Sequence, residues 1–242
     1  MFDHVTIRVS DREMSERFYE TVLRTLGIEQ THRGEHYTEW DDFSLALADD
    51  ENPPTGGLHV GFVARARSHV DEFWRVGTEA GYRDDGAPGP RPEYSDDYYG
   101  AFLLDPDGNS VEAVHHGSLR KGGNVDHLWI RVSDVAAATS FYESVGPAAG
   151  FRVGSELGNR TRFACVSGSF SVVAGDNPTE NVHLAFTASD NDAVDRFHRD
   201  ATAKGYRDNG APGERTNYHE GYYGAYVLDP DGNNIEVVSH NR

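Results

Sequence analysis

Histidine stands near the start of four segments in which apolar and polar residues alternate. These histidines are His4, His59, His127 and His183. Because successive side chains of a strand point to opposite faces, the apolar row that begins with Val5 and Ile7 lies on one face and His4 on the other. Glu112 and Glu236 each lie between apolar neighbours in a further segment of this kind. A carboxylate in such a position needs a partner for its charge.

Each half of the chain therefore supplies two histidines and one glutamate on predicted strands. Two neutral imidazoles and one carboxylate give a divalent cation three protein ligands. Taken singly, each of these histidines is equally compatible with a half-exposed strand position, and each glutamate with a solubilising charge on an edge strand. The repeated placement of all three types favours a metal site in at least one half. The donor types suit Fe(II), Mn(II), Zn(II) or Ni(II) and do not choose among them.

Further polar side chains lie on the same segments. By alternation, Arg8 and Arg131 point to the same face as the nearby histidines. An arginine there requires an anionic partner, which is either a negatively charged substrate or a carboxylate of a neighbouring unit. The two tyrosines at 222–223 point in opposite directions, so Tyr222 is a candidate to contact a substrate while its neighbour packs.

The elements that carry these residues are repeated along the chain. Residues 3–11 return at 126–134 after a shift of 123, and the run Asp-Pro-Asp-Gly-Asn at 105–109 returns at 229–233 after a shift of 124. The repeat predicts two homologous domains joined by a short polar linker. The predicted ranges are 1–117 for the first domain, 118–123 for the linker and 124–242 for the second domain.

Each half itself reads as two units of one strand, one helix and three strands. In the first unit, residues 3–9 alternate as a strand, and Ser10 and Glu13 form a capping box for a helix that ends at Gly27. The other elements expected in the first half are strands near 29–33, 36–40, 43–48, 58–64, 98–104 and 109–115 and a helix near 68–80. The predicted fold class is α+β, with four βαβββ units.

Composition excludes several classes of partner. The 242 residues include 22 basic and 40 acidic side chains, which gives a net charge of −18. Such a surface repels a phosphate backbone and an anionic membrane, so neither nucleic acid nor a membrane is an expected partner. The only cysteine, Cys165, excludes an intrachain disulfide. With no recognisable targeting segment, a cytoplasmic location is expected. The oligomeric state is not predicted.

The tandem arrangement, the Asp-His openings at 3–4 and 126–127 and the ending Leu-Asp-Pro-Asp-Gly-Asn-x-x-Glu resemble the vicinal oxygen chelate superfamily, which includes glyoxalase I, extradiol dioxygenases and bleomycin resistance proteins. The resemblance covers almost the whole chain. It implies that the four units form two tandem cupped-barrel domains around metal sites. It also implies one triad of His4, His59 and Glu112 and another of His127, His183 and Glu236.

Departures from individual subfamilies bear on the reaction. Glyoxalase I uses an additional glutamate late in the first unit, but the strands here read Phe-Ser-Leu-Ala-Leu at 43–47 and Phe-Ser-Val-Val-Ala at 170–174. Extradiol dioxygenases place a tyrosine ten residues before the glutamate ligand. Tyr226 occupies that place before Glu236, whereas Phe102 precedes Glu112. Such enzymes also place an acid–base histidine upstream of the second ligand, but residues 167–181 contain none. His219 is the candidate to replace it, although a solvated loop histidine is the alternative.

The sequence thus predicts a divalent-metal-dependent enzyme that acts on a small molecule with adjacent oxygen atoms. Dioxygenase-like chemistry is favoured slightly over lyase or isomerase chemistry, with Tyr226 and His219 as the candidate catalytic residues. The alternative is a non-catalytic protein that binds a small molecule such as an antibiotic. The sequence leaves open whether the units pair within each half or across the halves.

Overall fold

The computed structural model describes residues 1–165 and 168–241, which divide into two compact units. One unit comprises residues 6–129, and the other comprises residues 1–5 and 130–242. The first five residues therefore fold with the second half of the sequence. The repeat boundary at 117–124 remains a prediction, because the division of the structure is set by spatial contacts and not by homology.

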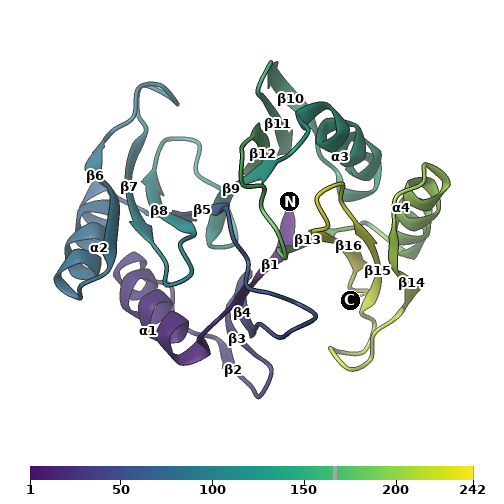
Figure 1. The fold of residues 1–242 in the computed structure, drawn as a ribbon, viewed down its shortest axis with the longest axis horizontal. Helices are drawn as coiled ribbons and strands as arrows, with labels where there is room; N and C mark the ends of the chain where they lie inside the picture. Colours follow the sequence, from purple (N-terminus) through teal and green to yellow (C-terminus); the bar gives the residue numbers. More distant parts are fainter. Residues whose placement is uncertain (166–167, 242) are drawn as a thin grey trace. The chain divides into compact units, whose positions relative to one another are not determined.

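The order of elements follows the repeat (Figure 1). In the first half the structure has β1 (Phe2–Val9), α1 (Arg12–Leu23), η1 (Arg24–Leu26), β2 (His32–Arg33), β3 (Tyr37–Trp40), β4 (Phe43–Leu47), β5 (Leu58–Val63), α2 (Arg67–Glu79), β6 (Arg83–Pro90), β7 (Tyr99–Leu104) and β8 (Ser110–His115). In the second half it has β9 (Val125–Val132), α3 (Val135–Ala149), β10 (Arg152–Leu157), β11 (Arg160–Cys165), β12 (Gly168–Ala174), β13 (His183–Thr187), α4 (Asn191–Ala203), β14 (Asp208–Glu214), β15 (Tyr223–Leu228) and β16 (Asn234–Ser239).

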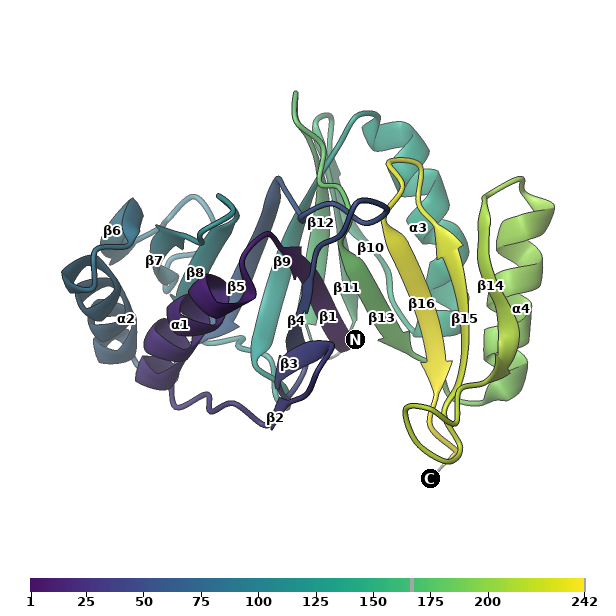
Figure 2. The same ribbon diagram turned by 60° about the horizontal axis from the view of Figure 1, so that its bottom comes forward.

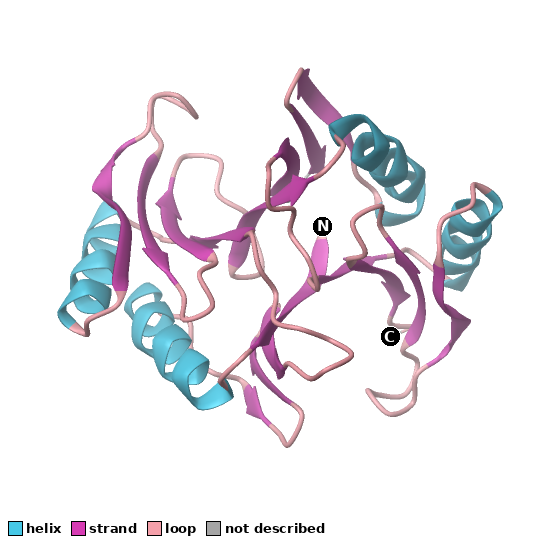
Figure 3. Ribbon diagram, viewed as in Figure 1, coloured by secondary structure: helices cyan, strands magenta, loops and turns pink. Residues whose placement is uncertain are grey.

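Within the unit of residues 6–129, β2, β3 and β4 form an antiparallel meander. In the same unit β6, β7 and β8 are antiparallel, while β5 and β8 run parallel. Helices α1 and α2 pack against each other, and α2 covers one face of β6 to β8 (Figure 3). The covered face is apolar, so the other face is left for polar side chains.

The unit of residues 1–5 and 130–242 repeats this plan. Strands β10, β11 and β12 are antiparallel, β14 pairs with β15 and β15 with β16 in antiparallel fashion, and β13 runs parallel to β16. Helices α3 and α4 pack against each other, and α4 covers β15 and β16 (Figure 2). Each unit thus encloses its own core between helices and strands.

The strands form two mixed eight-stranded sheets. Their orders are β14-β15-β16-β13-β1-β4-β3-β2 and β10-β11-β12-β9-β5-β8-β7-β6. Both sheets are built from βαβββ units, so the predicted α+β class with four such units is confirmed.

Burial explains why the strands take these faces. The apolar rows predicted for the first strand of each unit are fully buried, and they are Val5, Ile7, Val9, Leu58, Val60, Phe62, Leu128, Ile130, Val132, Leu184 and Phe186. The largest buried side chains are aromatic, with Phe18, Tyr19, Trp40, Phe43, Phe62 and Phe73 in one unit and Phe141, Tyr142, Phe163, Phe170, Phe186 and Phe197 in the other. At roughly 1.5–3 kcal/mol for each fully buried large side chain, these rows dominate the stability of each core.

The repeated Asp-Pro-Asp-Gly-Asn turn fixes the parallel strands that carry the glutamates. Asn109 is buried, and its side chain accepts a hydrogen bond from the backbone of Leu58 and donates to Asp105 and to the carbonyl of Thr55. The hydroxyl of Tyr19, from α1, also donates to Asp105. The turn therefore ties the start of β8 to the start of β5, which sets the register of both strands.

Two local expectations differ from the structure. The first helix is capped by Asp11, whose side chain accepts a hydrogen bond from the backbone of Met14, because the hydroxyl of Ser10 donates instead to Asp107. Strand β6 and its counterpart β14 are third strands that the βαβββ pattern requires, but their ranges escape prediction, since their Gly-Ala-Pro-Gly sequence is poor in strand-forming residues. Both lie at sheet edges, where proline and bulges are tolerated.

Candidate metal centres

His59, Glu112 and His127 come together in the unit of residues 6–129, and we call this group the His59 centre. His59 Nε2 lies 3.0 Å from Glu112 Oε2 and 3.2 Å from His127 Nε2. The third side of the triangle, from His127 Nε2 to Glu112 Oε2, is 3.3 Å. The side chains are 13%, 1% and 10% exposed for His59, Glu112 and His127. Three potential ligand atoms thus face one another among largely buried side chains.

The backbone requires small residues around this centre. In the parallel ladder Gly61 lies opposite Glu112. A Cβ atom at Gly61 would stand 2.7 Å from His127 Nδ1, and one at Gly100 would collide with Glu112 Oε1. The absence of a Cβ atom at both positions allows the imidazole and the carboxylate to approach the strands closely.

Each candidate ligand side chain of the His59 centre also forms a hydrogen bond with a residue outside the group of three. His59 Nδ1 lies 3.1 Å from the hydroxyl of Ser110, and the hydroxyl of Tyr98 donates to Glu112 Oε1 at 2.8 Å. His127 Nδ1 lies 3.0 Å from Asp126 Oδ2, which also accepts from His116. Partners of this kind fix the tautomer and orientation of metal-binding imidazoles in many proteins.

His4, His183 and Glu236 form the equivalent group in the other unit, the His4 centre. His4 Nε2 lies 3.0 Å from His183 Nε2, and His183 Nε2 lies 3.1 Å from Glu236 Oε2. The distance from His4 Nε2 to Glu236 Oε2 is longer, at 3.7 Å. The histidine side chains are also more exposed, at 27% for His4 and 20% for His183.

The outer partners of the His4 centre match those of the other centre in part. The hydroxyl of Tyr222 donates to Glu236 Oε1 at 2.7 Å, as Tyr98 does to Glu112. His4 Nδ1 lies 2.9 Å from Asp3 Oδ1, whose other oxygen lies 2.6 Å from His240 Nε2.

The predicted grouping of the six ligands is wrong in one respect. The resemblance implied that each triad comes from one half of the sequence, but His4 joins His183 and Glu236, while His127 joins His59 and Glu112. The cause is that each first-strand histidine belongs to the compact unit built largely from the other half. Each centre therefore takes its candidate ligands from both halves of the sequence.

The donor sets and spacings fit a divalent ion. Ligand bonds of roughly 2.1 Å place neighbouring donors about 3.0–3.4 Å apart, depending on the angle between them. All three separations in the His59 centre fall in this range, and two of three do so in the His4 centre. Two imidazoles and a carboxylate suit Fe(II), Mn(II), Zn(II) or Ni(II).

Charge also favours a cation at the His59 centre. Burial alone would raise the pKa of Glu112, but hydrogen bonds from His127 and His59 outweigh it and lower the pKa to about 2. Burial opposes the charge of His127 as well, yet Asp126 and Glu112 raise its pKa to about 10. The carboxylates of Asp126 and Glu112 thus favour positive charge at this point, which a bound cation would supply.

The remaining predicted site residues have mixed placements. Tyr226 pairs with Glu236 across the β15–β16 ladder, and its ring lies 6.2 Å from that of His183. His219 does not reach the centre directly, since its Nε2 lies 2.9 Å from His240 Nδ1. It is connected to His4 through His240 and Asp3.

The described contacts of the two arginines lie away from the donors. The Arg8 side chain donates to the carbonyl of Leu47, and its backbone donates to Thr55. Arg131 is exposed, and its aliphatic part lies against Gly175. Binding of a substrate by either arginine remains a prediction, as does substrate contact by Tyr222, whose hydroxyl is engaged with Glu236.

Sequence reasoning missed the residues that orient the donors. These are Asp3, Asp126, Tyr98, Ser110 and Asn234. For two of them a signal was present, because the Asp-His pair at 3–4 recurs at 126–127. An aspartate next to a candidate ligand histidine is a natural hydrogen-bond acceptor for its second nitrogen.

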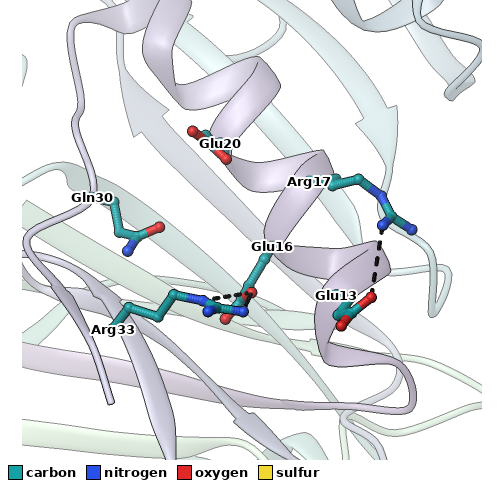
Figure 4. A pocket seen from close by; sticks show the side chains of 6 residues that line it. All are labelled: Glu13, Glu16, Arg17, Glu20, Gln30 and Arg33. Atoms are coloured by element: carbon teal, nitrogen blue, oxygen red, sulfur yellow. Dashed lines mark hydrogen bonds and ion pairs between the residues drawn. The ribbon is translucent and has the colours of Figure 1, made fainter. Parts of the chain in front are cut away.

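A separate surface hollow of about 290 Å³ lies beside α1 and contains none of the donors (Figure 4). It is lined by Glu13, Glu16, Arg17, Glu20, Gln30 and Arg33. Its ion pairs, Arg33 with Glu16 and Arg17 with Glu13, satisfy charges of both signs within the hollow.

In the part of the chain that the structure describes, no helix combines the length and apolar character required to cross a membrane.

Comparison with known proteins gives concordant results. The model of the family described as "Glyoxalase/Bleomycin resistance protein/Dioxygenase superfamily" matches residues 1–113 and again 124–237. The "Uncharacterized protein YqjT" of Bacillus subtilis (strain 168) is 29% identical over 122 residues, which are 46% of this chain and 95% of that protein.

Solved structures of glyoxalase I from Zea mays have a similar fold. The crystal structure of that protein superposes with a TM-score of 0.70 at 17% identity, covering 99% of this chain and 92% of that one. Its V278E mutant gives the same TM-score at 18% identity, with the same coverage. At this level of identity the likeness is one of fold.

Proposed function

The chain belongs to the glyoxalase/bleomycin resistance protein/dioxygenase superfamily, and from this premise we propose that it is a divalent-metal-dependent enzyme acting on a small molecule that offers adjacent oxygen atoms. The observation that carries the proposal is the pair of His–His–Glu groups, whose donor atoms lie within 4.8 Å of one another in each group. The alternative that Glu112 and Glu236 are solubilising charges on edge strands does not fit, because both side chains are buried, at 1% exposure.

The residues around each centre have definable tasks in this proposal. His59, His127 and Glu112 would hold one ion, and His4, His183 and Glu236 the other. Tyr98 and Tyr222 hold one oxygen of each glutamate through their hydroxyl groups, so that the second oxygen faces the histidines. A divalent ion in such a site supplies Lewis-acid stabilisation of negative charge on a substrate oxygen.

Two features favour dioxygenase-like chemistry over the glyoxalase reaction. Strands β4 and β12 carry no carboxylate that could serve as an additional glutamate ligand. Tyr226 stands opposite Glu236 in the ladder, and burial together with the nearby Glu236 charge raises its pKa, so its hydroxyl stays protonated and able to donate at neutral pH. Tyr226 is thus the proposed catalytic proton donor at the His4 centre. The equivalent residue at the His59 centre is Phe102, which has no hydroxyl group.

His219 is proposed as a group that moves protons toward solvent. It is part-exposed, and its Nε2 contacts His240, which contacts Asp3 beside His4. A proton acceptor at the end of a hydrogen-bonded series is a common arrangement in acid–base catalysis.

Metal content tests the proposal. Elemental analysis of the purified protein should find up to two divalent ions per chain, and His59→Ala and His183→Ala should each remove one. Binding of an ion should also raise the thermal unfolding temperature, because an ion that binds only the folded state stabilises it. Absence of bound metal together with absence of any metal-dependent thermal shift would refute the enzyme proposal and favour the non-catalytic binding alternative.

The oxygen branch has its own test. Oxygen uptake by the Fe(II)-loaded protein would be measured with a panel of catechols, with Tyr226→Phe as the matched variant. Uptake that falls at least about tenfold in this variant supports the role of the hydroxyl. No uptake with any catechol would instead favour lyase or isomerase chemistry.

A further inference from the structure

We infer that the two metal centres are not equivalent: the His59 centre binds a divalent ion more tightly than the His4 centre, because Asp85 commits His59 to the metal-binding tautomer while Asn209 leaves His183 uncommitted. This inference rests on the proposed function. It assigns to Asp85 the part of a positioning residue that acts on the centre through Ser110.

At the His59 centre the outer hydrogen bonds run in one direction. The hydroxyl of Ser110 donates to Asp85 Oδ2 at 2.7 Å, since an ionised carboxylate only accepts. The oxygen of Ser110 then accepts from His59 Nδ1, 3.1 Å away, which places the ring proton on Nδ1. In its neutral form, the form that binds metal, His59 therefore has the lone pair on Nε2, which lies 3.0 Å from Glu112 Oε2 and 3.2 Å from His127 Nε2.

The His4 centre has amides at both of the equivalent positions. After the shift of 124, Ser110 corresponds to Asn234 and Asp85 to Asn209. Asn234 Nδ2 lies 2.8 Å from His183 Nδ1, and Asn209 Nδ2 donates to Asn234 Oδ1 at 3.0 Å. In this orientation His183 accepts at Nδ1 and carries its proton on Nε2, which points toward Glu236.

A pair of amides satisfies either tautomer of the imidazole. Rotating both side-chain amides by half a turn lets Asn234 accept from His183 Nδ1 and donate to Asn209 with the same number of hydrogen bonds. The amides therefore give no preference for the tautomer that binds metal. An ion entering the His4 centre requires both amides to reorient as His183 changes tautomer, whereas at the His59 centre the hydrogen bonds of Ser110 and Asp85 stay as they are.

The packing of the two centres differs in the same direction. Gly61, opposite Glu112 in its ladder, corresponds to Ala185, opposite Glu236. Where the glycine lies, the first-strand histidine and the glutamate are 3.3 Å apart, and where the alanine lies they are 3.7 Å apart. The histidines of the His4 centre are also about twice as exposed as those of the His59 centre.

The expected difference is substantial. Loss of an outer-shell partner lowers metal affinity by about 10- to 100-fold in known sites. Since both Asp85 and Asn209 are exposed, solvent weakens the electrostatic part of the effect, and we expect the lower end of this range.

Zinc titrations of single-centre variants test the inference. His183→Ala leaves the His59 centre, and His59→Ala leaves the His4 centre, and Zn(II) affinity is measured for each by competition with a chromophoric chelator. The His59 centre should bind about tenfold more tightly. Asp85→Asn in the His183→Ala background should raise its Kd about tenfold, while Asp96→Asn, which removes an exposed charge from the same unit, should leave it unchanged.

The reciprocal variant guards against misfolding as an explanation. Asn209→Asp in the His59→Ala background introduces an acceptor that turns Asn234 so that it accepts from His183 Nδ1, and the Kd of the His4 centre should fall. A gain of affinity cannot come from a damaged fold. Equal affinities of the two centres, or no response to Asp85→Asn while zinc still binds, would overturn the inference and leave the proposed function intact. No zinc binding in either background would overturn both.

Discussion

The substitution Gly61→Ala places one methyl group against the ring of His127, and its effect can be worked out from the structure. The added Cβ would stand 2.7 Å from Nδ1 and 3.0 Å from Nε2 of His127. The ring atom nearest to the added Cβ is Cε1, which would lie closer still. Since non-bonded heavy atoms in ordinary contact are at least about 3.4 Å apart, the ring has to move by roughly 1 Å.

The ring has little freedom to do so. Its Nδ1 is held by Asp126 at 3.0 Å, and the His127 side chain is only 10% exposed. Ligands of a functional site tolerate displacements of about 0.5 Å, so we expect the Zn(II) affinity of the His59 centre to fall about tenfold, which equals about 1.4 kcal/mol. The free energy of unfolding should fall by about 1–3 kcal/mol, the usual range for an overpacked core, less the small gain from replacing a strand glycine.

The assay is the chelator competition in the His183→Ala background, combined with chemical denaturation in the absence of metal. The matched control is Ala185→Gly in the His59→Ala background, which removes the equivalent methyl group from the His4 centre. That control should not weaken Zn(II) binding. If Gly61→Ala binds zinc as tightly as its parent, the close approach of strand and imidazole does not set the geometry of the centre, and the reasoning is refuted.

Two further predictions concern single hydrogen-bonded carboxylates. Tyr222→Phe removes the hydroxyl that donates to buried Glu236, and it should lower the free energy of unfolding by about 1.5–3 kcal/mol. The control Tyr223→Phe removes a hydroxyl that donates to an exposed carboxylate, and it should lower the free energy of unfolding by less than about 1 kcal/mol. Equal losses for the two variants in urea denaturation would contradict this prediction. Burial alone would raise the pKa of Glu16, but hydrogen bonds from Arg33, Thr38 and Arg12 lower it below its usual value. The stability that Glu16 contributes is therefore present above the unfolded-state pKa of about 4.5 and is lost as pH falls through the lower folded-state pKa. The difference in unfolding free energy between the wild type and Glu16→Gln should accordingly shrink on acidification. A difference that stays constant from pH 7 to pH 3 would exclude this linkage.

Most of the fold could be predicted because the repeat shows the same pattern twice. Alternating rows such as Val5 and Ile7 identify buried strand faces, and Gly27 ends the first helical segment in the left-handed conformation that favours glycine. Strand β6 escaped prediction because its hydrogen bonds arise from pairing with β7 and not from the local preferences of Gly86 and its neighbours.

The six candidate ligands could be found for the same reason, but their grouping could not. In a duplicated sequence each first-strand histidine has two equivalent sets of partners, one in each half. Local pattern is the same for both choices. Only long-range strand pairing distinguishes them, and it brings His4 to His183 and His127 to His59.

The exchange of first-strand histidines makes each centre depend on both halves of the duplication. Residues 124–242 hold His183 and Glu236 but lack His4, and residues 1–117 hold His59 and Glu112 but lack His127. Two donors alone bind a divalent ion more weakly than three. Loss of either half would therefore damage both centres at once. This dependence holds even though the two centres differ at Gly61 and Ala185 and at Asp85 and Asn209.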